Sequence, residues 1–481
     1  MSLVDHVKRN RGHVLLAAAA CAALASARCS TTDAAPGAGD AGGVAQGSCE
    51  AGSAIAPQVT DGATPGREGL DPTMASAVAM LEEGRRTFRF DTFGDEGFWG
   101  GALGLNQAIL GSARGGVGPG VSPETALAVG LKIDLDALPP AVVDAIKGGT
   151  FDLKSPDSTL AALQLGAVVG VTGIFDASAG APKLTSMGIQ CALCHSTVDD
   201  ALAKGIGHRL DGWANRDLDV GAIVGLSPDL SGVATLLGVP EAAVRAVLAS
   251  WGPGKYDAQL FLDGKAAAPG GGGKSSATLI PPAFGLAGVN LGTSTGFGSV
   301  TYWNAFVANL EMHGKGTFFD PRLDDATRFP VAARARSGHV TSTDDRITPK
   351  LAALQVYQLA LRAPTPPPAS YDAALAATGK AVFEGAGRCA SCHVPPLFTE
   401  PGWNMHSGDE IGIDTFQSSR SPEARYRTSP LRGLFAHAKG GFYHDGRYAT
   451  VADVVRHYDT DLRLGLTEAE VTALVEYVKS L

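Results

Sequence analysis

The chain carries the same short pattern twice, Cys-Ala-Leu-Cys-His at residues 191–195 and Cys-Ala-Ser-Cys-His at residues 389–393. Two cysteines separated by two residues and followed by histidine are typical of c-type haem attachment. In that chemistry each thiol bonds to one vinyl group of the porphyrin, and the adjacent imidazole ligates the iron. The pattern constrains the fold strongly, because a covalently held haem becomes part of a hydrophobic core. The sequence therefore predicts two c-type haems, attached through Cys191, Cys194, Cys389 and Cys392, with His195 and His393 as iron ligands.

A thioredoxin-like redox pair and half of a zinc site are the competing interpretations of each cysteine pair. Neither interpretation uses the histidine that follows the pair, and the two pairs lie far apart in the sequence. The other cysteines, Cys21, Cys29 and Cys49, are all near the N-terminus. Every cysteine beyond Cys49 therefore belongs to a haem motif, which suits an oxidising compartment.

The composition is that of a globular, acidic chain. Of its 481 residues, 45% are hydrophobic and 18% are charged, which is enough to bury several cores. The formal net charge of −9 argues against nucleic-acid binding, which favours a basic surface. An acidic chain is compatible with a redox partner that carries a basic patch. We expect that partner to be a small cytochrome or a cupredoxin.

The N-terminal residues indicate export. Basic residues between Lys8 and Arg11 precede an apolar run at 14–27 that ends in Ala-Ser-Ala, which is the order of a secretory signal. We predict a signal peptide at 1–27, a disordered linker at 28–66, and a location in the periplasm or cell envelope. Cys29 leaves two further options open. Lipid attachment there, or at Cys21 within the apolar run, would provide membrane contact, and a disulfide between Cys29 and Cys49 is the alternative.

Helical periodicity in the remaining sequence predicts a mainly α fold, with two cytochrome c-like helical domains and an N-terminal helical extension. We assign the extension to residues 67–185 and the first haem domain to 186–363. A proline-rich linker at 364–370 follows, since three consecutive prolines cannot continue a helix. The second cytochrome c domain is assigned to 371–481. Its closing helix begins with a capping box at Thr467-Glu-Ala-Glu470.

Four phrases in the second domain carry a resemblance to a known family. They are YRTSPLRG at 426–433, GFYHDGRYAT at 441–450, VVRHYD at 454–459 and LGLT at 464–467. With them, residues 371–481 resemble the bacterial di-haem cytochrome c peroxidases, a family that includes the di-haem enzymes that mature methylamine dehydrogenase. Upstream, only the first haem motif and the two-domain layout match. The layout is also similar to that of the di-haem rubber oxygenases.

The resemblance implies that one haem transfers electrons and the other meets peroxide. It also implies a second axial ligand for the C-terminal haem at Tyr458, with His457, His406 and Met405 as rivals. The family tends to bind calcium between its domains, to which Asn215 would contribute. A tryptophan often lies between the haems of the family, and Trp213 and Trp251 are the candidates here.

For the first haem no spacing rule selects a second ligand among Met187, His208, Met312 and His313. The family's distal glutamate has no recognisable motif in this sequence. Arginines in the polar loop at 207–219 would pair either with haem propionates or with surface acids. The leading hypothesis is a di-haem cytochrome that carries electrons. The alternative is a peroxide- or oxygen-dependent di-haem oxidoreductase.

Overall fold

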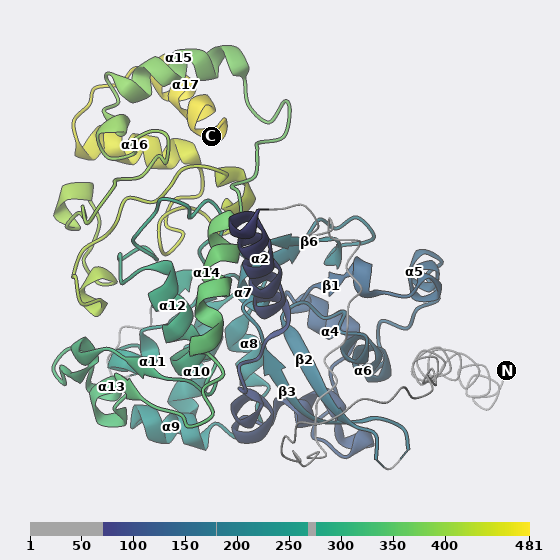
Figure 1. Cartoon of the computed structure of the whole chain (residues 1–481). Helices are drawn as coiled ribbons and strands as arrows, with labels where there is room; N and C mark the ends of the chain where they lie inside the picture. The colour runs from purple at the N-terminus through teal and green to yellow at the C-terminus, as the bar shows by residue number, and fades with distance from the viewer. Residues whose placement is uncertain (1–70, 179, 268–275) are drawn as a thin grey trace.

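The protein is described by a computed structural model that covers residues 71–178, 180–267 and 276–481. The expected signal peptide, the linker and Cys21, Cys29 and Cys49 lie outside these residues. The described chain is mainly helical, with five short two-stranded sheets (Figure 1). No single described helix is long and apolar enough to cross a membrane. The helices Ser231–Leu237 and Glu241–Trp251 meet that test only as a pair bent by 93°.

The α-helices have the following bounds: α2 Pro72–Phe90, α3 Leu105–Leu110, α4 Pro123–Ala128, α5 Pro140–Lys147, α6 Pro156–Gln164, α7 Ala192–His195, α8 Val220–Gly225, α9 Ser231–Leu237, α10 Glu241–Trp251, α11 Leu260–Asp263, α12 Val300–Phe306, α13 Pro330–Ala335, α14 Leu351–Ala360, α15 Ala373–Glu384, α16 Val451–Asp461 and α17 Glu468–Lys479. Two π-helices are η1 Gly97–Ala102 and η4 Val307–Glu311. The 3₁₀ turns are η2 Ser112–Arg114, η3 Leu135–Ala137, η5 Pro321–Asp324, η6 Thr348–Lys350, η7 Cys389–Ser391, η8 Asp409–Ile411, η9 Ser418–Arg420 and η10 Leu434–His437.

The strands are β1 Ile133–Asp134, β2 Val171–Asp176, β3 Lys183–Ile189, β4 Ser196–Val198, β5 Ile206–Gly207, β6 Arg209–Asp211, β7 Lys255–Tyr256, β8 Thr278–Leu279, β9 Phe318–Phe319 and β10 His339–Val340. The pair β1 and β5 is parallel, and the pairs β2–β3, β4–β6, β7–β8 and β9–β10 are antiparallel.

The hairpin β2–β3 corrects the expectation of a wholly helical extension at 67–185. Its register pairs Gly173 with Met187 and Thr172 with Gly188. A side chain at Gly188 would collide with the Asp95 carboxyl group, so glycine lets this strand approach the segment after α2. Strand β3 then runs directly into the first haem motif. The strand signal is weak because glycines interrupt its alternation of apolar residues.

Hydrophobic cores divide at the proline-rich segment. One cluster contains only residues from Val382 onward, with Phe383, Leu474 and Val478 among its members. The clusters before it lie between Phe88 and Leu361. Trp99 and Leu184 of the expected extension share a core with Leu248 of the expected first haem domain. The domain boundaries themselves remain predictions.

In the second half, α15 and α17 pack together, with α16 close by (Figure 1). The capping box at Thr467 is confirmed, because Thr467 accepts from the Glu470 amide and the Glu470 carboxylate accepts from the Thr467 amide. In the first half, α2 lies along α14 (Figure 1). The contact is close at Gly84, where a Cβ atom would lie 2.0 Å from the carbonyl oxygen of Ala353.

Candidate functional site

The first motif forms the short helix α7 between strands β3 and β4. The thiols of Cys191 and Cys194 are free, and burial raises the pKa of each to about 12. Partial burial lowers the pKa of the half-buried His195 to about 4 and keeps the imidazole neutral. Its Nδ1 lies 3.1 Å from the carbonyl oxygen of Pro281. With Nδ1 held by the main chain, Nε2 is the nitrogen left to bind a metal.

The second motif repeats this arrangement on a different backbone. Cys389 begins the turn η7, after Arg388 in the left-handed region with φ 55°. Burial raises the pKa of the Cys389 thiol to about 11 and lowers the pKa of His393. The Nδ1 of His393 lies 3.1 Å from the carbonyl oxygen of Phe398. Both motif histidines are therefore half-buried, neutral and oriented by a main-chain carbonyl group of a residue later in the chain.

These surroundings bear on the redox-pair interpretation of the motifs. A redox-active cysteine works as a thiolate and has a lowered pKa. Burial keeps the thiols of Cys191, Cys194 and Cys389 protonated instead. A covalently attached haem fits this arrangement. The free thiols would bond to the porphyrin, and the neutral imidazole, whose Nδ1 is already occupied, would bind the iron through Nε2.

Tyr458 lies on α16 beside the second motif. Burial raises the pKa of its phenol, and the nearby Cys392 and Cys389 sulfurs act in the same direction. The rival His457 points elsewhere, since its Nε2 lies 2.8 Å from the carbonyl oxygen of Ile411. Met405 packs against the first half of the chain, where its sulfur would collide with any side chain at Gly296. The choice of Tyr458 as the second ligand of this haem stays a prediction.

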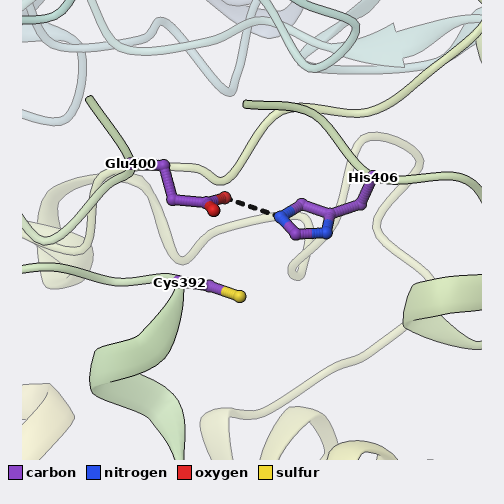
Figure 2. A group of neighbouring side chains, drawn as sticks. All are labelled: Cys392, Glu400 and His406. Atoms are coloured by element: carbon purple, nitrogen blue, oxygen red, sulfur yellow. Dashed lines mark hydrogen bonds and ion pairs between the residues drawn. The ribbon is translucent and has the colours of Figure 1, made fainter. Parts of the chain in front are cut away.

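His406 belongs to a small polar group next to the second motif. Its Nε2 lies 2.6 Å from the Glu400 carboxylate, and Cys392 completes the group (Figure 2). The hydroxyl group of Thr428 also donates to Glu400. One donor atom from each of Cys392, Glu400 and His406 lies within 4.8 Å of the others, close enough to hold a metal ion. The imidazole nitrogen of His406 that faces Glu400 is already used for the contact drawn as a dashed line in Figure 2.

The four candidates around the first motif lie in different places. His208 is more than half exposed and pairs with Asp136, so it lies away from the buried motif. His313 has φ 59° and stacks on Phe98 with ring centroids 3.8 Å apart. Met187 and Met312 are both buried, and the core of Met312 includes Cys191.

A buried acid beside the first motif has no signal in the sequence. Glu311 ends the π-helix η4, where it accepts a hydrogen bond from the Tyr256 hydroxyl group. Burial raises the pKa of Glu311 to about 8, and its charge in turn raises the pKa of Cys194. Trp251 packs edge-on against Tyr256, at 5.3 Å between ring centroids. Only the tertiary fold brings Glu311 to Cys194, because they are far apart in sequence.

The other suggested residues separate into distinct roles. Arg209 forms an ion pair with Asp134, and this pair is buried and does not lie on the surface as the salt-bridge interpretation expects. Arg216 has no acidic partner among the described residues. The side-chain amide of Asn215 bonds to main-chain groups, donating to Gly130 at 3.0 Å and accepting from Asp217. These bonds give Asn215 a structural role, so nothing in its surroundings supports calcium.

Aromatic side chains lie between the two motifs. Trp213 follows the first motif and lies edge-on to Phe284 and Phe435, at 6.5 Å and 5.8 Å between centroids. Phe284 follows Pro281, whose carbonyl group contacts His195. Phe435 belongs to η10, next to Leu434 in the core that contacts Cys389. Trp251, in contrast, lies within the core of the first half.

Comparisons with known proteins add little. No family model matches the chain, and no curated protein matches it. A solved structure of hydrazine synthase from Kuenenia stuttgartiensis, pressurised with xenon, is similar at 17% identity. The match covers 47% of this chain and 86% of that chain with a TM-score of 0.25. A TM-score this low supports no conclusion about fold or activity.

Proposed function

We propose that this chain is a di-haem c-type cytochrome that transfers electrons in the bacterial cell envelope. One observation carries the proposal. Both Cys-x-x-Cys-His motifs present free thiols and a half-buried neutral histidine whose Nδ1 lies 3.1 Å from a main-chain carbonyl oxygen. A haem bound there would supply a one-electron redox centre in each half of the chain.

The residues between the motifs support electron transfer from one half to the other. Trp213, Phe284 and Phe435 form an aromatic series that begins next to the first motif and ends in the second half. Hydrogen bonds to main-chain carbonyl groups hold this boundary together, since the Leu279 amide donates to His444 and the Lys255 ammonium group donates to Asp445. A fixed boundary keeps the distance between the two centres constant.

Haem loading is the direct test. The chain is produced with its own N-terminus in a host that attaches c-type haem, and covalent haem per chain is measured from the pyridine haemochromogen spectrum. We expect two haems in the wild type and one in each double variant, C191A/C194A and C389A/C392A. Ser391→Ala changes a residue between the cysteines and should keep both haems. A wild-type chain without covalent haem would refute the proposal.

Envelope location and the partner belong to the same proposal. The net charge of −9 suits docking with a small cytochrome or cupredoxin that carries a basic patch. The rate of electron exchange with such a partner should fall as ionic strength rises. Fractionation of cells that express the full chain tests the location, and cytoplasmic protein without haem would contradict it.

Glu311 favours a second candidate function, a peroxide- or oxygen-dependent oxidoreductase. Peroxide chemistry needs an acid–base group beside an open iron position. Glu311 is buried next to Cys194, it holds the Tyr256 hydroxyl group, and its other carboxylate oxygen, Oε1, has no hydrogen-bond partner. Its carboxyl group is therefore placed to accept or donate a proton in that pocket.

Spectroscopy separates the two functions. An oxidoreductase should show a high-spin ferric population that binds cyanide and consumes peroxide. Glu311→Gln should then lower peroxide turnover by about 100-fold or more while the haem spectra persist. Glu241→Gln, on α10, is the control and should keep full turnover. Two low-spin haems that are inert to peroxide, also after half-reduction, would leave electron transfer as the function.

A further inference from the structure

Arg216 is a buried cation without an anionic partner among the described residues. The residue before it is tied to the first motif, because the Asn215 main-chain amide donates to the Cys194 carbonyl oxygen at 2.9 Å. The residue is only 9% exposed, and its Nε atom has no hydrogen-bond partner. The contact on Nη1 is the main-chain carbonyl oxygen of Lys439, at 3.3 Å. Burial without a neighbouring carboxylate lowers the pKa of this guanidinium to about 10.

Other buried arginines of the protein have acids beside them. Arg209 pairs with Asp134 at 2.5 Å, Arg89 pairs with Asp211 at 2.5 Å, and Arg420 contacts two aspartates. Removing a guanidinium from water is costly unless an anion compensates. Arg427 also lacks an acid among the described residues, and its Nη1 atom has no hydrogen-bond partner there, but its Nε donates to the Thr293 carbonyl oxygen. The surroundings of Arg216 are therefore incomplete without a negatively charged ligand.

The position of Arg216 indicates which ligand this is. Its main chain follows the residue that is bonded to the first motif, and its guanidinium reaches the loop after η10, close enough to His437 to help lower the pKa of that imidazole. A neutral His437 supplies no compensating charge. A haem attached at Cys191 and Cys194 carries two carboxylates, and the guanidinium fork matches a carboxylate with two parallel hydrogen bonds.

We propose that Arg216 binds a propionate carboxylate of the first haem and joins that haem to the loop of the second half that includes Lys439. This inference rests on the proposed function, since it requires a haem at the first motif. The loop is held at the same place by an ion pair between Lys439 and Asp217. Haem loading in the first half thereby strengthens its contact with the second half.

The test uses the full haem-loaded chain and three variants. Arg216→Gln removes the charge, Arg216→Lys keeps it without the fork, and Arg209→Gln removes a buried guanidinium that already has Asp134. The readouts are covalent haem per chain, the propionate bending band in resonance Raman spectra, and a redox titration of both haems.

For Arg216→Gln we expect the propionate band to shift and the ferric-to-ferrous ratio of the first haem, at fixed ambient potential, to rise about tenfold. That factor corresponds to about 59 mV for one electron. It is the size expected when one charge is lost about 10 Å away at an effective dielectric constant near 20. Arg216→Lys should shift the band and change the ratio about twofold or less. Arg209→Gln should leave both readouts at wild-type values.

Several results would overturn the inference. Suppose that both Arg216 variants carry two haems and keep the wild-type propionate band and ferric-to-ferrous ratio. That result would refute the inference and leave the proposed function intact. A shift confined to the second haem, or a shift in Arg209→Gln alone, would also refute it. If Arg216→Gln does not fold, the propionate band of Arg216→Lys is the test, and an unchanged band in that variant would refute the inference. A wild-type chain without covalent haem would refute the proposed function itself, and the inference with it.

Discussion

Buried acids are the residue-scale feature that sequence patterns do not reveal. Glu311 and Asp95 lie in the interior, and burial raises their pKa values to about 8 and about 9. Asp95 accepts from the Ile189 amide at 3.2 Å through Oδ2, and its Oδ1 has no hydrogen-bond partner. Each acid is therefore protonated in the folded chain at neutral pH. Both lie near the first motif, because each adds to the raised pKa of one of its cysteines.

Asp95→Asn should remove part of the pH dependence of stability. The unfolded chain ionises Asp95 near pH 4 and the folded chain only near pH 9, so Asp95 destabilises the fold as pH rises between these values. The variant should match the wild type near pH 4 and become progressively more stable above it. Between pH 6 and 9 its relative stability should rise by up to about 4 kcal/mol. Denaturant unfolding at several pH values measures this.

Asp144→Asn on the exposed side of α5 is the control and should keep the wild-type pH profile. Parallel profiles of Asp95→Asn and wild type would show that Asp95 is ionised in the folded state.

Tyr458→Phe tests the second iron ligand. Because a tyrosinate ligand favours ferric iron, its loss should raise the reduction potential of the second haem and change its absorption spectrum. Tyr448→Phe is the control, since Tyr448 stacks near His457 and does not approach the cysteines. A Tyr458→Phe variant with unchanged potential and spectrum would mean that Tyr458 only packs in the core.

At the scale of elements, glycines set how closely helices approach. α15 and α17 touch at Gly379, where a Cβ atom would lie 1.9 Å from the Ala473 carbonyl oxygen. The π-helices also meet, because the indole nitrogen of Trp99 in η1 donates to the carbonyl oxygen of Met312, just after η4. π-helical turns are rare and frequent at functional sites. Here they bring Glu311 and Met312 toward the first motif.

Gly379→Ala should separate α15 from α17. The added methyl group cannot fit against a backbone oxygen, so the helices must shift, and we expect a loss of about 1–3 kcal/mol in unfolding free energy. Denaturant unfolding measures the loss. Thr378→Ala, one residue earlier on the exposed side of α15, should change stability by less than about 0.5 kcal/mol. Equal stabilities of the two variants would contradict the close contact.

At the scale of the molecule, charged residues join the two halves. Arg420 in the second half is fully buried between Asp257 and Asp263 of the first, with contacts of 3.0 Å and 2.8 Å. Gln417 donates to Gln259 at 3.0 Å beside them. This boundary positions the aromatic series between the motifs.

Arg420→Met should destabilise the boundary by about 3–5 kcal/mol, because it leaves the buried carboxylate of Asp257 without a cation and that of Asp263 with only Lys265, at 4.0 Å. Calorimetry should show the two halves unfolding at separate temperatures. Arg425→Met removes an exposed ion pair with Glu410 and should have little effect. A single unfolding transition of Arg420→Met at the wild-type temperature would contradict this role of Arg420, Asp257 and Asp263.

The sequence by itself determined the features that depend only on residues close to one another in the chain. The spacing of two cysteines and a histidine is a local chemical requirement, and the capping box at Thr467 and the stop at the proline-rich segment are local as well. The helices around 72–90, 351–360, 373–384 and 468–479 follow from apolar periodicity. The β2–β3 hairpin was missed because its glycines hide the alternation.

Only the tertiary structure decided how the motifs are surrounded. The carbonyl group that orients His195 belongs to Pro281, 86 residues later in the chain. The acid beside Cys194 comes from a π-helical turn, and the environment of Arg216 is completed by a loop of the second half. Burial sets the pKa values of these groups, and burial depends on contacts between segments that are distant in sequence. No local pattern encodes such contacts.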